Sequence, residues 1–349
     1  MANATFTEVE LKELPIAKQV ALANRHYEGL SDLLMAINGQ GLNSGLVGEG
    51  TLADTLFPNA GKLTNRGSGS SKKEDTAVET EALVGEKSYA RPNGSDYFAR
   101  KWGTSDNADV EVLRKLRDNK QYVLLYGAPG CGKTALVEAS FGSDLFTILG
   151  SGDTELSDFI GGYVQTPSGG FEWVDGALIQ SAEQGKPLLI DEIGLIDTKV
   201  LSALYGLMDG RQEITITQNP ERGTIKAQEG FFVIGATNPN APGVRLSEAL
   251  LSRFVVQAEM TTDYSLSKKM GVPNNIVVAS QNLFKKQQSG ETSWSPQMRE
   301  LLAFRDVSEI FGTKFAIENL IAVAPENDRP VVIEVLNRVF GEECRPAKI

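Results

Sequence analysis

Short, mainly apolar runs alternate with helical segments along the middle of the chain. Each run has four to six residues and is bounded by polar residues or glycine, which is typical of a strand buried inside a sheet. These runs are residues 122–126, 145–149, 187–190, 231–236 and 254–258. The segments between them carry apolar residues three or four apart, and they predict helices over 110–117, 135–141, 177–184, 199–208 and 246–253. This order of elements indicates an α/β domain.

Two further segments alternate apolar and polar residues with a period of two, as β-hairpins do. The first hairpin is predicted to pair 162–165 with 170–174, and the second to pair 213–217 with 223–227. Beyond residue 263 the strand pattern stops. Helical spacing there predicts helices over 266–270, 275–288, 295–305, 306–311, 316–322 and 331–340. The carboxyl-terminal part is therefore expected to be all helical.

The amino-terminal part is the least informative. Apolar residues at helical spacing from Leu14 to Ile37 predict one or two helices, and residues 66–75 have the composition of a linker. We expect an N-terminal helical extension over 1–75, a linker over 76–105, the α/β core over 106–262 and the helical domain over 263–349. The extension is either a plain helical addition or an adaptor surface or oligomer contact.

Charge and cysteine content narrow the classes of partner. The 349 residues contain 34 Lys and Arg against 45 Asp and Glu, a net charge of −11. Proteins that coat nucleic acid or anionic membranes are usually basic, so neither role is favoured, although a small basic surface inside a ring pore fits the total. Cys131, Cys344 and the single His26 have no metal-site spacing, and two thiols fit a reducing, cytoplasmic setting. The chain shows neither a signal-peptide pattern nor an apolar run of about 18 residues, so we expect no membrane association.

The motif with the clearest chemistry follows the first predicted strand. Residues 127–134 fit the G-x-x-x-x-G-K-[ST] pattern of a phosphate-binding loop between a strand and a helix. Such a loop curls its backbone N–H groups around phosphates, and the following helix adds its positive end. Lys133 is expected to reach the β- and γ-phosphates of ATP, and the Thr134 hydroxyl to bind Mg²⁺. The loop residues expected to contact ATP are Gly127, Ala128, Pro129, Gly130, Cys131, Gly132, Lys133, Thr134 and Ala135.

Two later strands lead into polar residues that complete such a site. The strand at 187–190 runs into Asp191 and Glu192, a Walker B pattern. In this pattern Asp191 holds Mg²⁺, directly or through water, and Glu192 is the general base for the attacking water. The strand at 231–236 leads into Asn238, at the end of a strand where ligands bind in open α/β sheets. The chain ahead of the first strand is expected, by its position, to lie over the adenine.

Taken together, these motifs resemble the MoxR-like AAA+ ATPases. More broadly, the chain is similar to the helix-2-insert clade, which includes MoxR, the CbbQ/NorQ activases, the cobaltochelatase AAA+ subunit, GvpN, McrB and dynein. The resemblance covers about Tyr122 to Ile321 and rests on residues 157–161 with 171–176, 188–193, 235–239 and 249–254. It implies an AAA+ P-loop NTPase with a parallel five-stranded sheet and two β-hairpin inserts, followed by an all-helical lid domain.

The resemblance also implies roles for single residues. Asn238 corresponds to sensor 1, which orients the attacking water. Arg253 corresponds to the arginine finger, which reaches the γ-phosphate bound by a neighbouring subunit, although Ser252 stands where the family usually has Asp. Arg299 corresponds to sensor 2 and is expected to contact the nucleotide, with extra residues between it and the preceding proline. A finger that acts in trans implies a homo-oligomeric ring, usually a hexamer.

The task that such an ATPase performs stays open. The leading hypothesis is remodelling or activation of a protein partner, a MoxR-like chaperone activity, and in this family the partner often carries a von Willebrand A domain. A DNA-directed translocating motor and the AAA+ subunit of a metal chelatase are the alternatives. The presence of Glu192, Asn238 and Arg253 disfavours a nucleotide-gated scaffold that hydrolyses little. Tyr163 and Trp173 in the first hairpin either grip a substrate or pack the hairpin base.

Overall fold

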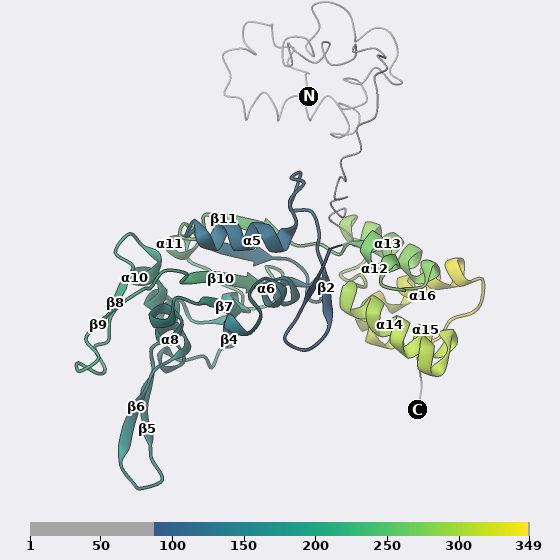
Figure 1. Cartoon of the computed structure of the whole chain (residues 1–349). Helices are drawn as coiled ribbons and strands as arrows, with labels where there is room; N and C mark the ends of the chain where they lie inside the picture. Colours follow the sequence, from purple (N-terminus) through teal and green to yellow (C-terminus); the bar gives the residue numbers. More distant parts are fainter. Residues whose placement is uncertain (1–86, 348–349) are drawn as a thin grey trace, which may run out of the picture. The chain divides into compact units, whose positions relative to one another are not determined.

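The computed structural model describes residues 87–347. The expectations for residues 1–75, for the first part of the 76–105 linker and for His26 lie outside the described residues. Within the described range, an α/β core is followed along the chain by a group of helices (Figure 1). Among the helices of residues 87–347, none is long and apolar enough to cross a lipid bilayer.

The central sheet is formed by five short strands. They are β3 (Val123–Tyr126), β4 (Phe146–Leu149), β7 (Pro187–Asp191), β10 (Phe232–Thr237) and β11 (Val256–Glu259). The strands lie in the order β11-β3-β10-β7-β4, and all neighbours are parallel. Nearly every residue of the three middle strands is buried, because helices cover both faces of a parallel sheet. That burial explains why these strands read as apolar runs, and the predicted parallel five-stranded sheet is confirmed.

The helices of the core either precede the first of these strands, as α5 does, or lie in the connections between them. They are α5 (Asp109–Asp118), α6 (Lys133–Phe141), α7 (Leu156–Ile160), α8 (Ala177–Gln184), α9 (Thr198–Leu201), α10 (Tyr205–Met208) and α11 (Glu248–Leu251). The single helix predicted over 199–208 is interrupted by a 3-10 turn at Ser202–Leu204. There the Ser202 hydroxyl donates to Lys199 O at 2.6 Å, a local hydrogen bond that competes with regular helix.

Within residues 87–347, three antiparallel hairpins accompany the core. The two predicted ones are β5 (Gly162–Gln165) with β6 (Phe171–Val174) and β8 (Glu213–Thr215) with β9 (Thr224–Lys226). The third pairs β1 (Ser88–Ala90) with β2 (Asp96–Phe98), inside the segment expected to be a linker. The turn-forming residues there close a hairpin, in which Gly94 N donates to Arg91 O at 3.0 Å, and Tyr97 of β2 is buried in the core.

The helices after residue 263 form the part named here the lid. They are α12 (Tyr264–Lys269), α13 (Asn274–Gln288), α14 (Met298–Phe311), α15 (Thr313–Val323) and α16 (Arg329–Phe340). Their apolar residues form a cluster separate from that of the sheet. The two helices predicted over 295–311 are one helix, since no glycine interrupts it before Gly312 and Asp306 pairs with Arg305 instead of capping a new helix.

Candidate nucleotide-binding site

The phosphate-loop motif lies between the end of β3 and the start of α6, at the carboxyl edge of the sheet. Gly127 N donates a hydrogen bond to Thr237 O at 3.2 Å, which ties the start of the loop to β10. Lys133 is 6% exposed, and its Nζ donates to Gly127 O at 2.9 Å and to Ala128 O at 3.1 Å. The ammonium group thus lies against the backbone of the loop, within reach of any anion bound there.

Two glycines of the loop occupy positions that no side chain fits. A Cβ on Gly127 would lie 2.2 Å from Met260 O, so the loop packs directly on the chain that leaves β11. Gly132 has a φ of 101° and precedes the first residue of α6. This left-handed conformation is open to glycine without strain. The path of the backbone therefore requires both glycines of the motif.

Asp191 and Thr134 are in direct contact at the edge of the sheet. Thr134 Oγ1 donates to Asp191 Oδ2 at 2.8 Å, and Glu192 N donates to Asp191 Oδ1 at 3.1 Å. A hydroxyl and a carboxylate are ligands that suit Mg²⁺, which takes few protein ligands when it also binds phosphates and water. Within residues 87–347, no group of three or more His, Cys, Asp and Glu is placed to hold a metal ion. A Mg²⁺ ion here would therefore depend on Thr134, Asp191 and the oxygens of the nucleotide.

Glu192 adopts an unusual backbone conformation. Its φ is 51°, in the left-handed region that non-glycine residues rarely occupy. Such a residue costs of order 1–3 kcal/mol and is held in place by its surroundings, a feature that clusters at functional positions. The conformation turns the chain at the end of β7, directly after Asp191.

The register of the strands places Asn238 at the same edge. Thr237 pairs with Tyr126, so Asn238 follows β10 at the level where Gly127 follows β3. Its side chain is half-buried, and Oδ1 accepts a hydrogen bond from Asn240 N at 3.2 Å. Since β10 lies between β3 and β7, Asn238 directly follows the strand between the one that leads into the phosphate loop and the one that ends at Asp191.

The lid contributes Arg299 to this edge. Arg299 N donates to Gly130 O at 3.3 Å, and a Cβ on Gly130 would lie 2.9 Å from Arg299 Cβ. Gln297 caps α14, is buried, and its Oε1 accepts a hydrogen bond from Thr262 Oγ1 at 2.8 Å. The first turn of α14 is thus anchored to the phosphate loop, and the Arg299 side chain is exposed there.

Arg253 lies elsewhere in the core. It precedes β11, and Val256 at the start of β11 pairs with Val123 at the start of β3. The phosphate loop follows the other end of β3. The rise of that strand, roughly 10 Å, therefore separates Arg253 from the phosphate loop along the strand direction. The Arg253 guanidinium packs 4.2 Å from the centroid of the Tyr205 ring, and Nη1 donates to Ala249 O at 2.5 Å. The structure therefore brings together every predicted site residue except Arg253.

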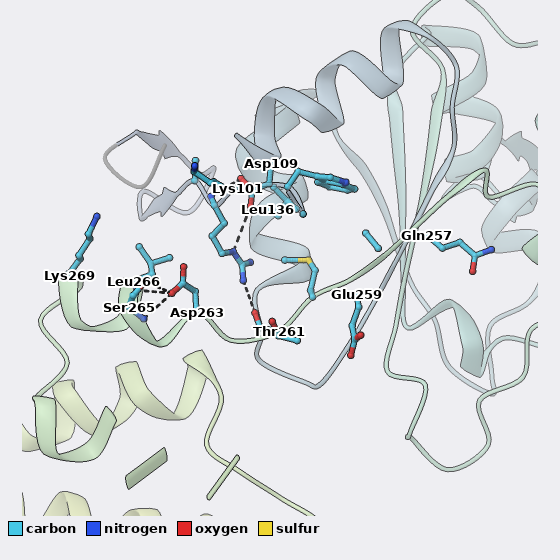
Figure 2. A pocket seen from close by; sticks show the side chains of 16 residues that line it. Lys101, Asp109, Leu136, Gln257, Glu259, Thr261, Asp263, Ser265, Leu266 and Lys269 are labelled. Carbon is cyan, nitrogen blue, oxygen red and sulfur yellow. Dashed lines mark hydrogen bonds and ion pairs between the residues drawn. The ribbon is translucent and has the colours of Figure 1, made fainter. Parts of the chain in front are cut away.

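A cavity of about 630 Å³ opens beside the loop (Figure 2). Its walls come from residues 99–103, from β11 and the residues after it, from α12, and from Leu136 of α6. Residues 99–103, in the chain ahead of the first core strand, thus line this cavity, and the expectation that this chain lies over the adenine stays a prediction. Arg100 and Asp109 line this cavity, and sequence reasoning missed both. No spacing pattern links them to the loop, because their neighbours are brought together by the fold.

Arg100 and Asp109 form a buried charged cluster with Tyr97. The Tyr97 hydroxyl donates to Asp109 Oδ2 at 2.5 Å, and Arg100 Nε donates to the Tyr97 hydroxyl oxygen at 3.1 Å. Burial raises the pKa of the Asp109 carboxyl, although hydrogen bonds from Tyr97 and the Arg100 backbone oppose the change. Burial also raises the pKa of Tyr97, so its hydroxyl stays protonated and donates.

Comparisons with known proteins agree with this architecture. Residues 122–254 match the family model of the AAA domain, dynein-related subfamily. The chain is 35% identical to a midasin of Giardia intestinalis over 140 residues, which are 38% of this chain and 3% of that protein. It is 28% identical to an uncharacterised protein of Staphylococcus saprophyticus over 248 residues, which are 63% of this chain and 89% of that protein.

Further relatives are matched over part of their length. An uncharacterised protein of Staphylococcus aureus strain COL is 34% identical over 161 residues, 44% of this chain and 60% of that protein. The chain thus spans a small fraction of the midasins and 60% of this relative. A solved structure from Cytophaga hutchinsonii matches 65% of this chain and 80% of its own at 19% identity, with a TM-score of 0.37.

The phosphate loop after β3, the polar ends of β7 and β10 and the order of the parallel strands define a P-loop NTPase with the α/β fold of AAA+ proteins. The region matched by the family model contains the phosphate loop, Asp191, Glu192 and Asn238. The chain thus contains a region similar to the AAA domain over residues 122–254.

Proposed function

We propose that this chain hydrolyses ATP with Mg²⁺ in a ring of identical subunits and uses the energy to remodel or activate a protein partner, as the MoxR-like ATPases do. The observation that carries this proposal is the place of Arg253. Arg253 and the phosphate loop of the same subunit lie at opposite ends of the neighbouring strands β11 and β3, so the rise of a strand separates them. An arginine finger placed there serves a neighbouring subunit.

The surroundings of Arg253 support a role at a surface between subunits. Its Nε is buried and has no acceptor within the described part of the chain, while the guanidinium packs on Tyr205. An arginine held against an aromatic ring is pre-organised, and it retains donors for an anion. A trans arginine contributes on the order of 10³-fold or more to phosphoryl transfer, so a monomer should be a poor ATPase. The resemblance implies six subunits.

Within one subunit the proposed roles follow the geometry. The loop amides, Lys133 and Arg299 would bind the phosphates, and Thr134 with Asp191 would hold Mg²⁺. When bound, Mg²⁺ neutralises charge that develops on the phosphate oxygens. Glu192 would accept the proton of the attacking water, and Asn238 would orient that water.

The first hairpin favours a protein over a nucleic acid as the partner. Its residues 162–174 include no Lys or Arg, and their one charged residue is Glu172. Tyr163, Val164 and Phe171 are 58%, 52% and 69% exposed. Phosphate contacts need basic side chains, whereas exposed apolar side chains suit contact with a polypeptide. A protein with a von Willebrand A domain is the partner class that the resemblance implies.

The test of the ring uses two variants that damage different halves of one shared site. Glu192→Gln removes the proposed base from the subunit's own site, and Arg253→Ala removes the finger that it offers to its neighbour. Each variant alone should lose ATP turnover. In a random equal mixture about a quarter of the sites combine an intact base with an intact finger, and turnover should return in proportion.

The matched control is Arg338→Ala, which removes an exposed arginine paired with Glu334 on α16. This variant should turn over ATP as the wild type does. The mass of the protein in ATP should be that of a ring. Turnover unaffected by Arg253→Ala, together with a monomeric mass, would contradict the proposal. Stimulation of turnover by DNA would favour the translocating motor instead.

A further inference from the structure

The Arg100 side chain lies at the meeting point of three parts of the chain. It follows the β1–β2 hairpin, it lines the cavity beside the phosphate loop, and its side chain is 13% exposed. Its Nε lies close to the Asp109 carboxylate and its Nη1 donates to Thr261 O, and Figure 2 labels both of these partners. Each nitrogen of the Arg100 guanidinium faces a different element.

The first contact anchors Arg100 to the core. Nε donates to the Tyr97 hydroxyl oxygen at 3.1 Å and lies 3.7 Å from Asp109 Oδ2. Asp109 is 4% exposed and also accepts a hydrogen bond from Arg100 N at 3.1 Å. An arginine whose charge is compensated by one buried carboxylate is held in a single orientation. Removing both charged groups from water costs free energy, so stabilisation of the fold alone is a poor explanation for the pair of Arg100 and Asp109.

The second contact reaches the connection to the lid. Nη1 donates to Thr261 O at 3.0 Å. Thr261 lies between the end of β11 at Glu259 and the start of α12 at Tyr264, where the chain passes from the core into the lid. The residue before it, Met260, donates its N–H to Tyr126 O at 2.7 Å.

The third contact is with the phosphate loop. Nη2 lies 3.1 Å from the point where a Cβ on Gly132 would stand, so the guanidinium packs on the backbone of the residue before Lys133. A side chain at Gly132 would displace it. Arg100 is therefore a physical link between the loop that would hold the phosphates and the segment that leads from β11 into the lid.

We propose that Arg100 is a positioning residue for the nucleotide site, which holds the core–lid connection against the phosphate loop so that nucleotide binding and the position of the lid depend on each other. The inference rests on the proposed nucleotide site. Without Arg100, Thr261 O loses its donor and the loop loses a packed neighbour. A lysine would place one compact charge there. Its ammonium group lacks the planar guanidinium geometry with which Arg100 contacts three elements at once.

The test compares Arg100→Gln and Arg100→Lys with a matched control in the hairpin that precedes Arg100. Arg91→Gln removes a salt bridge of 2.6 Å to Glu138 on α6, which also anchors the hairpin to the core. Arg100→Gln should weaken ADP binding, measured by calorimetry, about tenfold, the effect of losing one charge-assisted hydrogen bond. Arg100→Lys should recover part of that affinity. Arg91→Gln should change it by less than about twofold.

A second measurement separates positioning from loss of stability. In the wild-type chain, saturating ADP should slow amide hydrogen exchange both at residues 127–134 and at residues 260–272. In Arg100→Gln at saturating ADP, protection of 127–134 should remain and protection of 260–272 should be lost. A structural role alone would speed exchange at both segments with and without ADP.

Three outcomes overturn the inference. Normal ADP affinity in Arg100→Gln would do so, as would an equal loss in Arg91→Gln, which would mean that any loosening of the hairpin is enough. Retained protection of 260–272 would contradict the link to the lid. If the wild-type chain binds no ADP and does not differ from Lys133→Ala in this measurement, the result would instead contradict the proposed nucleotide site itself.

Discussion

Arg222, in the turn of the second hairpin, forms a two-pronged ion pair with Asp175 at the base of the first hairpin. Nε lies 3.1 Å from Asp175 Oδ1, and Nη2 lies 2.7 Å from Asp175 Oδ2. Nη2 also donates to Glu183 on α8 at 2.7 Å, and the Trp173 indole N–H donates to Asp175 at 2.7 Å. The turn of the second hairpin is thus joined to the base of the first, although the sequence predicted the two hairpins separately.

Breaking this pair should loosen the second hairpin with little loss of overall stability. The side chains of Arg222 and Asp175 are 31% and 21% exposed, so Arg222→Gln should lower the free energy of unfolding by about 1 kcal/mol or less. Amide hydrogen exchange at residues 213–226 should become faster. The reversed pair, Asp175→Arg with Arg222→Asp, should restore slow exchange. Arg211→Gln, which breaks an exposed pair with Asp209, is the control and should leave exchange unchanged.

The contact between Gly127 and Met260 predicts a steric effect at the phosphate loop. Gly127→Ala should lower the free energy of unfolding by about 3 kcal/mol, because its methyl group would meet Met260 O and the loop or β11 must move. Urea unfolding measures the change. Gly243→Ala is the control: its φ is also positive, at 85°, but open space surrounds it, so about 1 kcal/mol is expected. Equal losses in the two variants would show that backbone conformation, and not the contact, sets the cost.

The left-handed backbone of Glu192 predicts an opposition between stability and turnover. Glu192→Gly should raise the free energy of unfolding by about 1 kcal/mol, because glycine adopts a φ of 51° without strain. The same variant should lose ATP turnover, since it lacks the proposed base. Glu192→Gln should also lose turnover while gaining no stability. A Glu192→Gly variant that is less stable than Glu192→Gln would mean that the side chain at this position contributes more to the free energy of unfolding than the backbone strain does.

The buried carboxyl of Asp109 predicts a specific dependence of stability on pH. Burial raises its pKa in the folded chain above the ordinary value of 3.8 for an aspartate, so between these two pKa values the folded state binds more protons than the unfolded state. Ionisation of Asp109 therefore lowers stability as pH rises through that window. The stability of the wild type relative to Asp109→Asn should fall as pH rises from about 4 toward neutrality, and it should level off above the folded pKa.

Denaturant unfolding of both proteins across this pH range measures the difference. The asparagine also changes hydrogen bonds with Tyr97 and Arg100, but that effect is independent of pH and shifts the whole curve. A relative stability that rises with pH would mean that Arg100 lowers the pKa of Asp109 more than burial raises it. Asp106→Asn, at an exposed ion pair with Lys101, is the control and should not show this fall, because the hydrogen bond from Lys101 lowers the pKa of Asp106.

The sequence was sufficient where a feature depends on neighbours along the chain. The phosphate loop, the acidic pair at Asp191 and the buried strands were all readable, because a strand buried on both faces must be apolar and a phosphate loop needs its glycines in order. The sequence predicted the ends of helices less accurately than it predicted the strands. The helix expected over 199–208 is interrupted, and the two expected over 295–311 are one, because local hydrogen bonds and ion pairs decide such details.

Tertiary structure alone decided the relations between residues far apart along the chain. Arg100 contacts Thr261 across 161 positions, and Arg222 contacts Asp175 across 47, and no periodicity encodes either pair. The same is true of Arg299, whose backbone meets Gly130 only when the lid packs on the loop. A sequence pattern reports what a residue does within its own strand, turn or helix, whereas an ion pair or a close approach depends on how separate elements pack in three dimensions.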